Sequence, residues 1–363
     1  MQLLRIAIYC PIGYVTGGPE ALHQLCDELR NQGQDARLVP TVFFGEPAIE
    51  YKVYDAPIAS FEFAKSADVI ITPENYINLD SNLSDYPQGQ IFIWWLSVDN
   101  CLEPIANSYE TKKHPIELRR MVTLGDRLRL KKSAVKTFLR SLVYKSNTSR
   151  QAISNSTFKL DFNSVSHMAQ SYYAQDFVSK ELGKPAPVVS DYIRREKIGY
   201  AHRDTVHSKK VVAYNFAKSH LLLSKTRKRL SAEIDFIPLV NMSSMQIRDQ
   251  LIRSDLYLDL GHFPGRDRLP REAISMDCPV LLARRGAARY REDFQLEEEF
   301  RFDIVNRSSK ELAYKIQELL VNKQEVLDRQ RAFKDSVCED KKNFRREVAG
   351  FLEILHLRNR NWH

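Results

Sequence analysis

The sequence predicts an α/β fold made of two doubly wound domains that face each other across a cleft. The chain has 363 residues, about twice the roughly 100–150 residues of a typical single domain. Hydrophobic residues make up 43% of it, which is enough for a large core. Short apolar runs alternate with helical patterns in both halves, as in parallel sheets that are flanked by helices.

The first half opens with a strand, a glycine-rich loop and a helix. Residues 4–9 (LRIAIY) are apolar apart from Arg5, which is typical of a strand buried on both faces. The sequence GGPE at residues 17–20 then leads into a helical pattern that ends near Gly33, since proline suits a first helical turn and glycine suits a stop. Further strands are predicted over residues 68–72, 90–98 and 165–169. We assign residues 1–187 to the first domain.

A second α/β series follows the KPAP sequence at residues 184–187. The apolar runs predict strands over residues 210–214, 234–238, 255–260 and 279–283. The helical patterns predict helices over residues 245–253, 271–276, 309–321 and 323–337. We assign residues 188–340 to the second domain, and residues 341–363 continue with a helical spacing of apolar side chains.

Composition argues against several classes of protein. The five cysteines are odd in number and contain no CxxC pair, which argues against a disulfide framework and a zinc cage and favours the cytoplasm. The longest apolar run, residues 91–96, is far shorter than the roughly 20 residues that cross a bilayer, and the start of the chain has no signal-peptide layout. No cluster has the spacing of metal ligands, so we expect no metal and no cofactor.

Basic residues gather between residues 110 and 150, where twelve Lys or Arg stand against three acids. Such a segment indicates a docking surface for an anionic partner, such as phospholipid, nucleic acid or a pyrophosphate-bearing acceptor. Residues 132–145 within it have the pattern of a basic amphipathic helix. This helix either lies on an anionic membrane surface or packs its apolar stripe on the first domain.

Two loops carry candidate anion-binding groups. Gly17 and Gly18 stand at a helix N-terminus, where backbone N–H groups and the helix dipole favour a phosphate; the alternative is a plain turn. Arg266 and Arg268 follow the predicted strand at residues 255–260, and arginine side chains match the oxygens of a pyrophosphate. The alternative for these arginines is a solvated loop held by salt bridges.

These features resemble the donor site of glycosyltransferases with the GT-B fold, especially a retaining family that includes many bacterial glycan-assembly enzymes. The resemblance rests on the opening glycine loop and on the sequence LPREA at residues 269–273, with Pro279 seven residues beyond Glu272. It implies two Rossmann-like domains and a role for Glu272 in holding the nucleotide ribose. It also implies that the glycine pair faces the donor phosphates and sugar. The family's earlier glutamate falls on Pro264 here.

Further candidate residues come partly from the resemblance and partly from the places of the residues themselves. Lys218, just after the first strand of the second domain, matches a residue that contacts the donor diphosphate. Asp99, at the end of the strand over residues 90–98, either orients or deprotonates an acceptor hydroxyl or caps a turn. Glu20 and His23 are further candidates for a base. Trp94 and Trp95 either stack on sugar rings or belong to the core. The resemblance implies that the last helix, residues 341–363, crosses back to the first domain.

The expected function is transfer of a sugar from a nucleotide diphosphate sugar to a hydroxyl of a glycan or lipid-linked acceptor, in bacterial surface polysaccharide assembly. The expected place is the cytoplasm or the inner face of the membrane, reached through residues 110–150. One alternative is a nucleic-acid or anionic-surface binding protein, but the charge comes with no recognised nucleic-acid module, so we expect no nucleic acid as partner. Another is a sugar-nucleotide epimerase or a glycan phosphorylase of the same fold.

Overall fold

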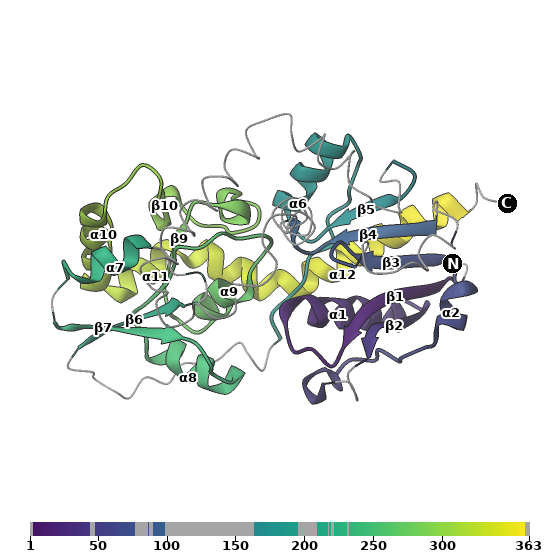
Figure 1. Cartoon of the computed structure of the whole chain (residues 1–363), viewed down its shortest axis with the longest axis horizontal. Helices are drawn as coiled ribbons and strands as arrows, with labels where there is room; N and C mark the ends of the chain where they lie inside the picture. Colours follow the sequence, from purple (N-terminus) through teal and green to yellow (C-terminus); the bar gives the residue numbers. More distant parts are fainter. Residues whose placement is uncertain are drawn as a thin grey trace, which may run out of the picture.

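A computed structural model describes residues 3–43, 48–76, 86, 90–98, 163–194, 209–216, 218, 221–230 and 232–359. These residues form two parallel sheets of five strands each, flanked by helices (Figure 1). The prediction of two α/β domains is therefore confirmed. Asp99, the basic segment at residues 110–150 and the amphipathic pattern at residues 132–145 lie outside the described residues.

The first sheet has the strand order β2-β1-β3-β4-β5. Its strands are β1 (Arg5–Ile12), β2 (Asp35–Phe43), β3 (Val69–Pro73), β4 (Ile91–Trp95) and β5 (Ser166–Ala169). Its helices are α1 (Gly17–Asn31), α2 (Phe61–Lys65) and α6 (Tyr172–Phe177), and shorter turns occupy Ile49–Tyr51 and Val178–Leu182. Every residue of β3 and β4 is buried, as expected of central strands that are covered on both faces.

Both tryptophans of β4 belong to the core. Trp94 Nε1 donates a hydrogen bond to the Val189 carbonyl at 3.0 Å, and Trp95 Nε1 donates to His167 Nδ1 at 3.1 Å. Each side chain is at most 1% exposed, so the idea that these rings stack on a sugar is wrong. A buried indole needs a partner for its N–H group, and here each has one.

The second sheet has the strand order β10-β9-β8-β6-β7. Its strands are β6 (Lys210–Asn215), β7 (Ile234–Leu239), β8 (Leu256–Asp259), β9 (Val280–Ala283) and β10 (Arg301–Phe302). Its helices are α7 (Leu221–Arg227), α8 (Ser244–Arg253), α9 (Arg268–Ser275), α10 (Ser309–Val321) and α11 (Lys323–Arg329), with short turns at Gly286–Arg289 and Glu298–Phe300. Read from its other edge, this order repeats that of the first sheet, so β8 occupies the position that β3 holds there.

The long helix α12 (Arg331–Asn359) runs from one domain to the other (Figure 1). Phe333 and Val337, near its start, share a hydrophobic cluster with β8 and β9. Its second half contributes to the cluster that contains β1 and α1, through Phe344, Val348, Phe351, Leu352 and Leu355. None of the helices in the described part of the chain is both long and apolar enough to cross a membrane.

Candidate active site

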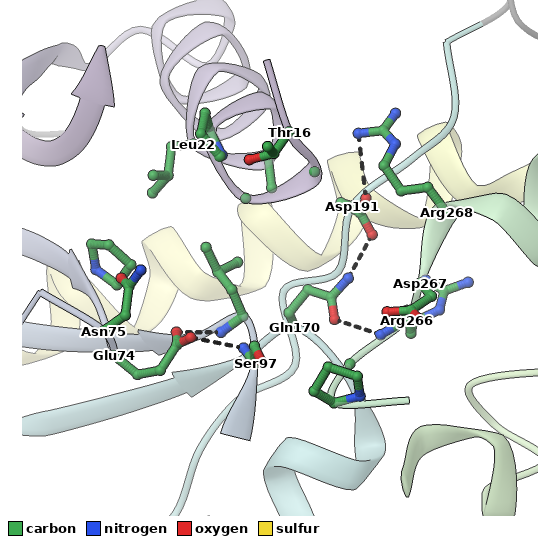
Figure 2. Close-up of a pocket in the computed structure, with 18 of the residues that line it drawn as sticks. Thr16, Leu22, Glu74, Asn75, Ser97, Gln170, Asp191, Arg266, Asp267 and Arg268 are labelled. Carbon is green, nitrogen blue, oxygen red and sulfur yellow. Dashed lines mark hydrogen bonds and ion pairs between the residues drawn. The ribbon is translucent and has the colours of Figure 1, made fainter. Parts of the chain in front are cut away.

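A cavity of about 630 Å³ lies between the two domains, at the carboxyl ends of both sheets (Figure 2). The first domain contributes the loop after β1, the start of α1 and the residues that follow β3, β4 and β5. The second domain contributes the residues after β6 and the loop between β8 and α9. Ligands of open α/β sheets bind at the carboxyl ends of the strands, so we take this cavity as the candidate active site.

Gly17 and Gly18 open α1 at the wall of this cavity. A Cβ atom on Gly17 would come within 3.2 Å of Arg268 Cδ, and one on Gly18 would lie 3.8 Å from Leu96 Cδ1. Thr16 precedes the helix in an extended conformation, but its side chain does not cap it. The absence of a capping side chain leaves the first turn of α1 suited to an anion, because its N–H groups and the helix dipole are directed there.

Lys218 reaches the cavity from the second domain and forms an ion pair with Asp267. Its backbone N–H donates to Asn215 Oδ1 at 3.3 Å, which fixes the turn after β6. The lysine packs so closely on Gly261 that a Cβ atom there would lie 2.4 Å from Lys218 Cβ. The glycine therefore allows the lysine to lie against the loop after β8, with its ammonium group at the cavity.

Arg268 links the second domain to Glu20 on α1. Its Nη1 atom lies 3.0 Å from Glu20 Oε2, and its Nη2 atom donates to the Tyr192 carbonyl at 3.2 Å. Glu20 also forms an ion pair with Arg194, whose Nε atom lies 2.9 Å from Oε1, and it accepts a hydrogen bond from the Tyr54 hydroxyl at 3.1 Å. Burial by itself would lower the pKa of Arg268, but the neighbouring carboxylates of Glu20 and Asp191 raise it, so the guanidinium stays charged.

Arg266 turns its backbone to the cavity and its side chain toward α12. Its backbone N–H donates to Gln170 Oε1 at 3.0 Å, across the domain junction. Its guanidinium binds Asp340 Oδ1 at 2.7 Å. Burial alone would lower the pKa of Arg266, and the carboxylates of Asp340 and Asp191 raise it above the ordinary value. The charge of Arg266 is therefore engaged between α9 and α12.

A buried ion cluster next to Arg266 was not predicted from the sequence. Arg271 is fully buried and binds Asp191 with Nη2 at 2.8 and 2.9 Å and Asp340 with Nη1 at 3.2 Å. Burial would raise the pKa of Asp191, but Arg271 and Arg268 lower it. Asp191 lies 80 positions from Arg271 in the chain, so the local sequence gives no sign of the pair. The cluster joins the segment around Asp191 to α9 and α12.

The remaining predicted site residues lie beside the cavity. Glu272 stands on α9 outside the cavity lining, and its Oε1 atom is 4.0 Å from Arg268 Nε. His23 is buried on α1, with Nδ1 2.7 Å from the Pro19 carbonyl oxygen, and burial lowers its pKa. The cavity thus brings together Gly17, Gly18, Lys218, Arg266 and Arg268, with Glu20 behind Arg268. No group of three potential metal ligands occurs among the described residues.

Glu74, which was also not predicted as a site residue, lines the first-domain wall just after β3. Its Oε2 atom accepts the Leu96 N–H at 2.8 Å, and its Oε1 atom accepts the Ser97 N–H at 3.0 Å (Figure 2). Burial raises the pKa of this carboxyl to about 8, although the backbone N–H groups oppose the rise. Its position directly after a strand that ends in Pro73 was the available sequence signal.

Comparisons with known proteins show the fold. No family model and no curated protein matches this chain. A glycosyltransferase from Rickettsia africae is 11% identical, with 98% of each chain covered and a TM-score of 0.58. Anabaena Alr3699/HepE, solved with UDP-glucose, is 13% identical over 96% of this chain and 99% of its own, with a TM-score of 0.61. WaaG, a glycosyltransferase involved in lipopolysaccharide biosynthesis, is 12% identical over 95% and 100%, with a TM-score of 0.52. The chain has the GT-B fold, as predicted.

Proposed function

We propose that this protein is a glycosyltransferase that moves a sugar from a nucleotide diphosphate sugar to an acceptor hydroxyl. The observation that carries this proposal is the cavity between the two GT-B domains, where Lys218 and the uncapped start of α1 line the same space. Both features favour negative charge, and they reach the cavity from opposite domains. A ligand with a diphosphate and a sugar fits such a place better than a single small anion does.

The donor side of the cavity supplies positive charge where the reaction needs it. In sugar transfer the bond between the anomeric carbon and the phosphate oxygen breaks, and its electron pair leaves with the nucleotide diphosphate. Fixed cations and backbone N–H groups stabilise the charge that develops. In our proposal the diphosphate replaces Asp267 as the partner of Lys218 and receives the N–H groups of Gly17 and Gly18.

Glu20, Arg266, Arg268 and Glu272 have supporting roles in this proposal. Glu20 fixes Arg268 at the cavity wall and is a poor candidate for a proton acceptor, because Arg194, Arg268 and Tyr54 already contact its oxygens. Arg266 contributes its backbone to the wall and its charge to the domain junction. Glu272 is the proposed partner of the donor ribose, which it would meet from α9. Asp99 remains a candidate acceptor-side group.

A UDP-sugar is our proposed donor and a glycan or lipid-linked saccharide our proposed acceptor. The UDP-glucose bound by HepE and the lipopolysaccharide role of WaaG support this choice within a shared fold. We further propose a role in bacterial surface polysaccharide assembly at the cytoplasmic face of a membrane. The basic sequence at residues 110–150 supports that location, because lysine and arginine clusters are attracted to anionic lipids.

The proposal is tested by nucleotide binding and by nucleotide release. Calorimetry with UDP, GDP and TDP should show binding of one of them to the full chain, and the matching nucleotide sugar should release that nucleotide. Lys218→Ala should weaken nucleotide binding roughly 10- to 100-fold, since a hydrogen bond to a charged group is worth about 1.5–3 kcal/mol.

Lys210→Ala is the matched control, because this lysine lies at the opposite end of β6, where it pairs with Asp255 at 3.7 Å. It should bind nucleotide as the wild type does. Absence of binding to all three nucleotides would refute the proposal. Steeply salt-dependent RNA or DNA binding that survives Lys218→Ala would favour the nucleic-acid alternative instead. Conversion of a sugar nucleotide without an acceptor, with no nucleotide released, would favour an epimerase.

A further inference from the structure

The first-domain wall of the cavity carries a polar pair, Glu74 and Ser97, that the proposed donor contacts do not include. Glu74 follows β3 and Ser97 follows β4, so neighbouring strands present them side by side (Figure 2). Both residues line the cavity together with Lys218 and Asp267 of the second domain. The pair therefore shares one space with the proposed donor site but belongs to the opposite wall.

Ser97 is unusual because its hydroxyl is buried without a partner among the described residues. The residue is 7% exposed, and its Oγ atom makes no hydrogen bond to any part of the chain that the structure describes. Buried hydroxyl groups are normally paired, because leaving one unpaired costs folding free energy. Because Ser97 lines the cavity, a ligand there can supply the partner that the described residues do not give its hydroxyl.

The Glu74 carboxyl is held rigidly but retains hydrogen-bonding capacity. The N–H groups of Leu96 and Ser97 fix both oxygens, and each oxygen has a second lone pair. Burial raises the pKa of Glu74 to about 8, so the carboxyl carries its proton at neutral pH and can donate as well as accept a hydrogen bond. A neutral carboxyl beside a hydroxyl suits an uncharged polar ligand better than a phosphate or a cation.

We propose that Glu74 and Ser97 form the subsite that binds a hydroxyl group of the saccharide acceptor. This inference rests on the proposed function, since it supplies the acceptor half of the same cavity. The saccharide hydroxyl both donates and accepts a hydrogen bond, and it finds both kinds of partner here. Because the backbone of β3 and β4 positions the pair, the subsite exists before the ligand arrives.

Saccharide binding tests this subsite directly, without knowledge of the natural acceptor. The probes are the methyl glycosides of glucose, galactose, mannose and N-acetylglucosamine. Saturation-transfer NMR measures their binding to the full chain, with and without UDP. We expect at least one of them to bind the wild type. Ser97→Ala should weaken that binding about tenfold, whereas its melting temperature should be no lower than that of the wild type, because no described residue loses a hydrogen bond.

Two further variants separate binding from folding. Glu74→Gln should also weaken glycoside binding, but with a lower melting temperature, because its amide nitrogen cannot accept a backbone N–H. Asp68→Asn makes the same chemical change at the amino end of β3, where the carboxylate accepts the Arg5 N–H at 2.8 Å. This control should bind glycosides as the wild type does.

The outcomes for the subsite and for the proposed function are distinct. Equal glycoside binding by the wild type and Ser97→Ala, or binding of no methyl glycoside at all, would overturn the subsite. Nucleotide calorimetry on the same samples reports on the proposed function, and Ser97→Ala should leave the nucleotide affinity unchanged. If glycosides bind through Glu74 and Ser97 but no nucleotide binds, the saccharide subsite stands and the proposed transfer reaction fails.

Discussion

Glu74 and Asp259 occupy equivalent positions in the two sheets, at the carboxyl ends of β3 and β8, but they have different surroundings. Asp259 accepts hydrogen bonds from the Tyr257 hydroxyl at 3.1 Å, the Asn215 amide at 3.0 Å and the Gly261 N–H at 2.9 Å. Glu74 accepts backbone N–H groups and lines the cavity. Burial raises the pKa of Asp259 to about 6 and that of Glu74 to about 8.

We infer from this difference that one topological position serves two purposes. Asp259 connects β8 to β6 and to the turn at Gly261. It thereby fixes the turn against which Lys218 packs. Its hydrogen bonds are made within the second domain, and it is not among the described residues that line the cavity. Glu74 shares that cavity with the opposite domain. We therefore expect Asp259 to matter for stability and Glu74 to matter for binding.

The largest expected effect separates these two roles. Asp259→Ala leaves the Tyr257, Asn215 and Gly261 donors without their buried acceptor, so it should lower the free energy of unfolding by about 3–5 kcal/mol. Glu74→Ala should cost about 1–2 kcal/mol, because water in the cavity can reach the freed N–H groups. Urea unfolding of both variants measures this. Equal losses of stability would remove the distinction between the two carboxyls.

The next effect concerns pH. Glu74 has a pKa of about 8 in the folded protein against the ordinary 4.5, so the folded state holds this proton more tightly than the unfolded chain does. The stability that this tighter proton binding contributes is fully present below pH 4.5 and is lost as the pH rises toward 8. Between pH 5 and pH 8 the wild type should lose roughly 2–4 kcal/mol more than Glu74→Gln, since one pKa unit corresponds to about 1.4 kcal/mol. Parallel pH profiles from urea unfolding would contradict the raised pKa.

The smallest expected effect tests how closely the two walls approach. A Cβ atom on Gly265 would lie 2.4 Å from the Leu96 carbonyl oxygen and 3.0 Å from Gln170 Oε1, both in the first domain. Gly265→Ala should therefore push the domains apart and cost about 1–3 kcal/mol of stability. Gly350→Ala on α12 is the control, because its added Cβ meets open space and should stabilise the helix by roughly 0.5–1 kcal/mol. Thermal unfolding compares the two variants. If Gly265→Ala is as stable as the wild type, the two domains can separate at this junction with little loss of stability.

Much of the fold could be predicted because its signals are local. The apolar run over residues 4–9, followed by the glycine pair and the pattern of α1, identifies one strand–loop–helix unit. Residues 269–273 and Pro279 carry the resemblance to the GT-B fold within a short stretch. Each of these signals depends on neighbours in the chain, where periodicity and turn chemistry act directly.

The candidate site could be predicted only in part, because its charges are set by distant partners. Arg268 and Glu20 stood out separately, but nothing in the sequence couples α9 to α1. The side chain of Arg266 turns to Asp340, and that contact depends on the course of α12. Glu74 was missed although it follows a predicted strand, because a single carboxylate after a strand has no distinctive pattern. Glu74 is distinguished by its burial and by its hydrogen bond from the Ser97 N–H, and only the folded chain brings these two residues together.

Helix α12 has a consequence for the order in which the protein is made. The hydrophobic face formed by β1 and α1 is completed by Phe344, Phe351 and Leu355, which are synthesised more than three hundred residues later. While the ribosome is still translating the second domain, that face lacks the side chains that α12 contributes. We therefore expect the first domain to reach its final packing only after α12 has left the exit tunnel. Until then, the apolar side chains that α12 covers are accessible to chaperones.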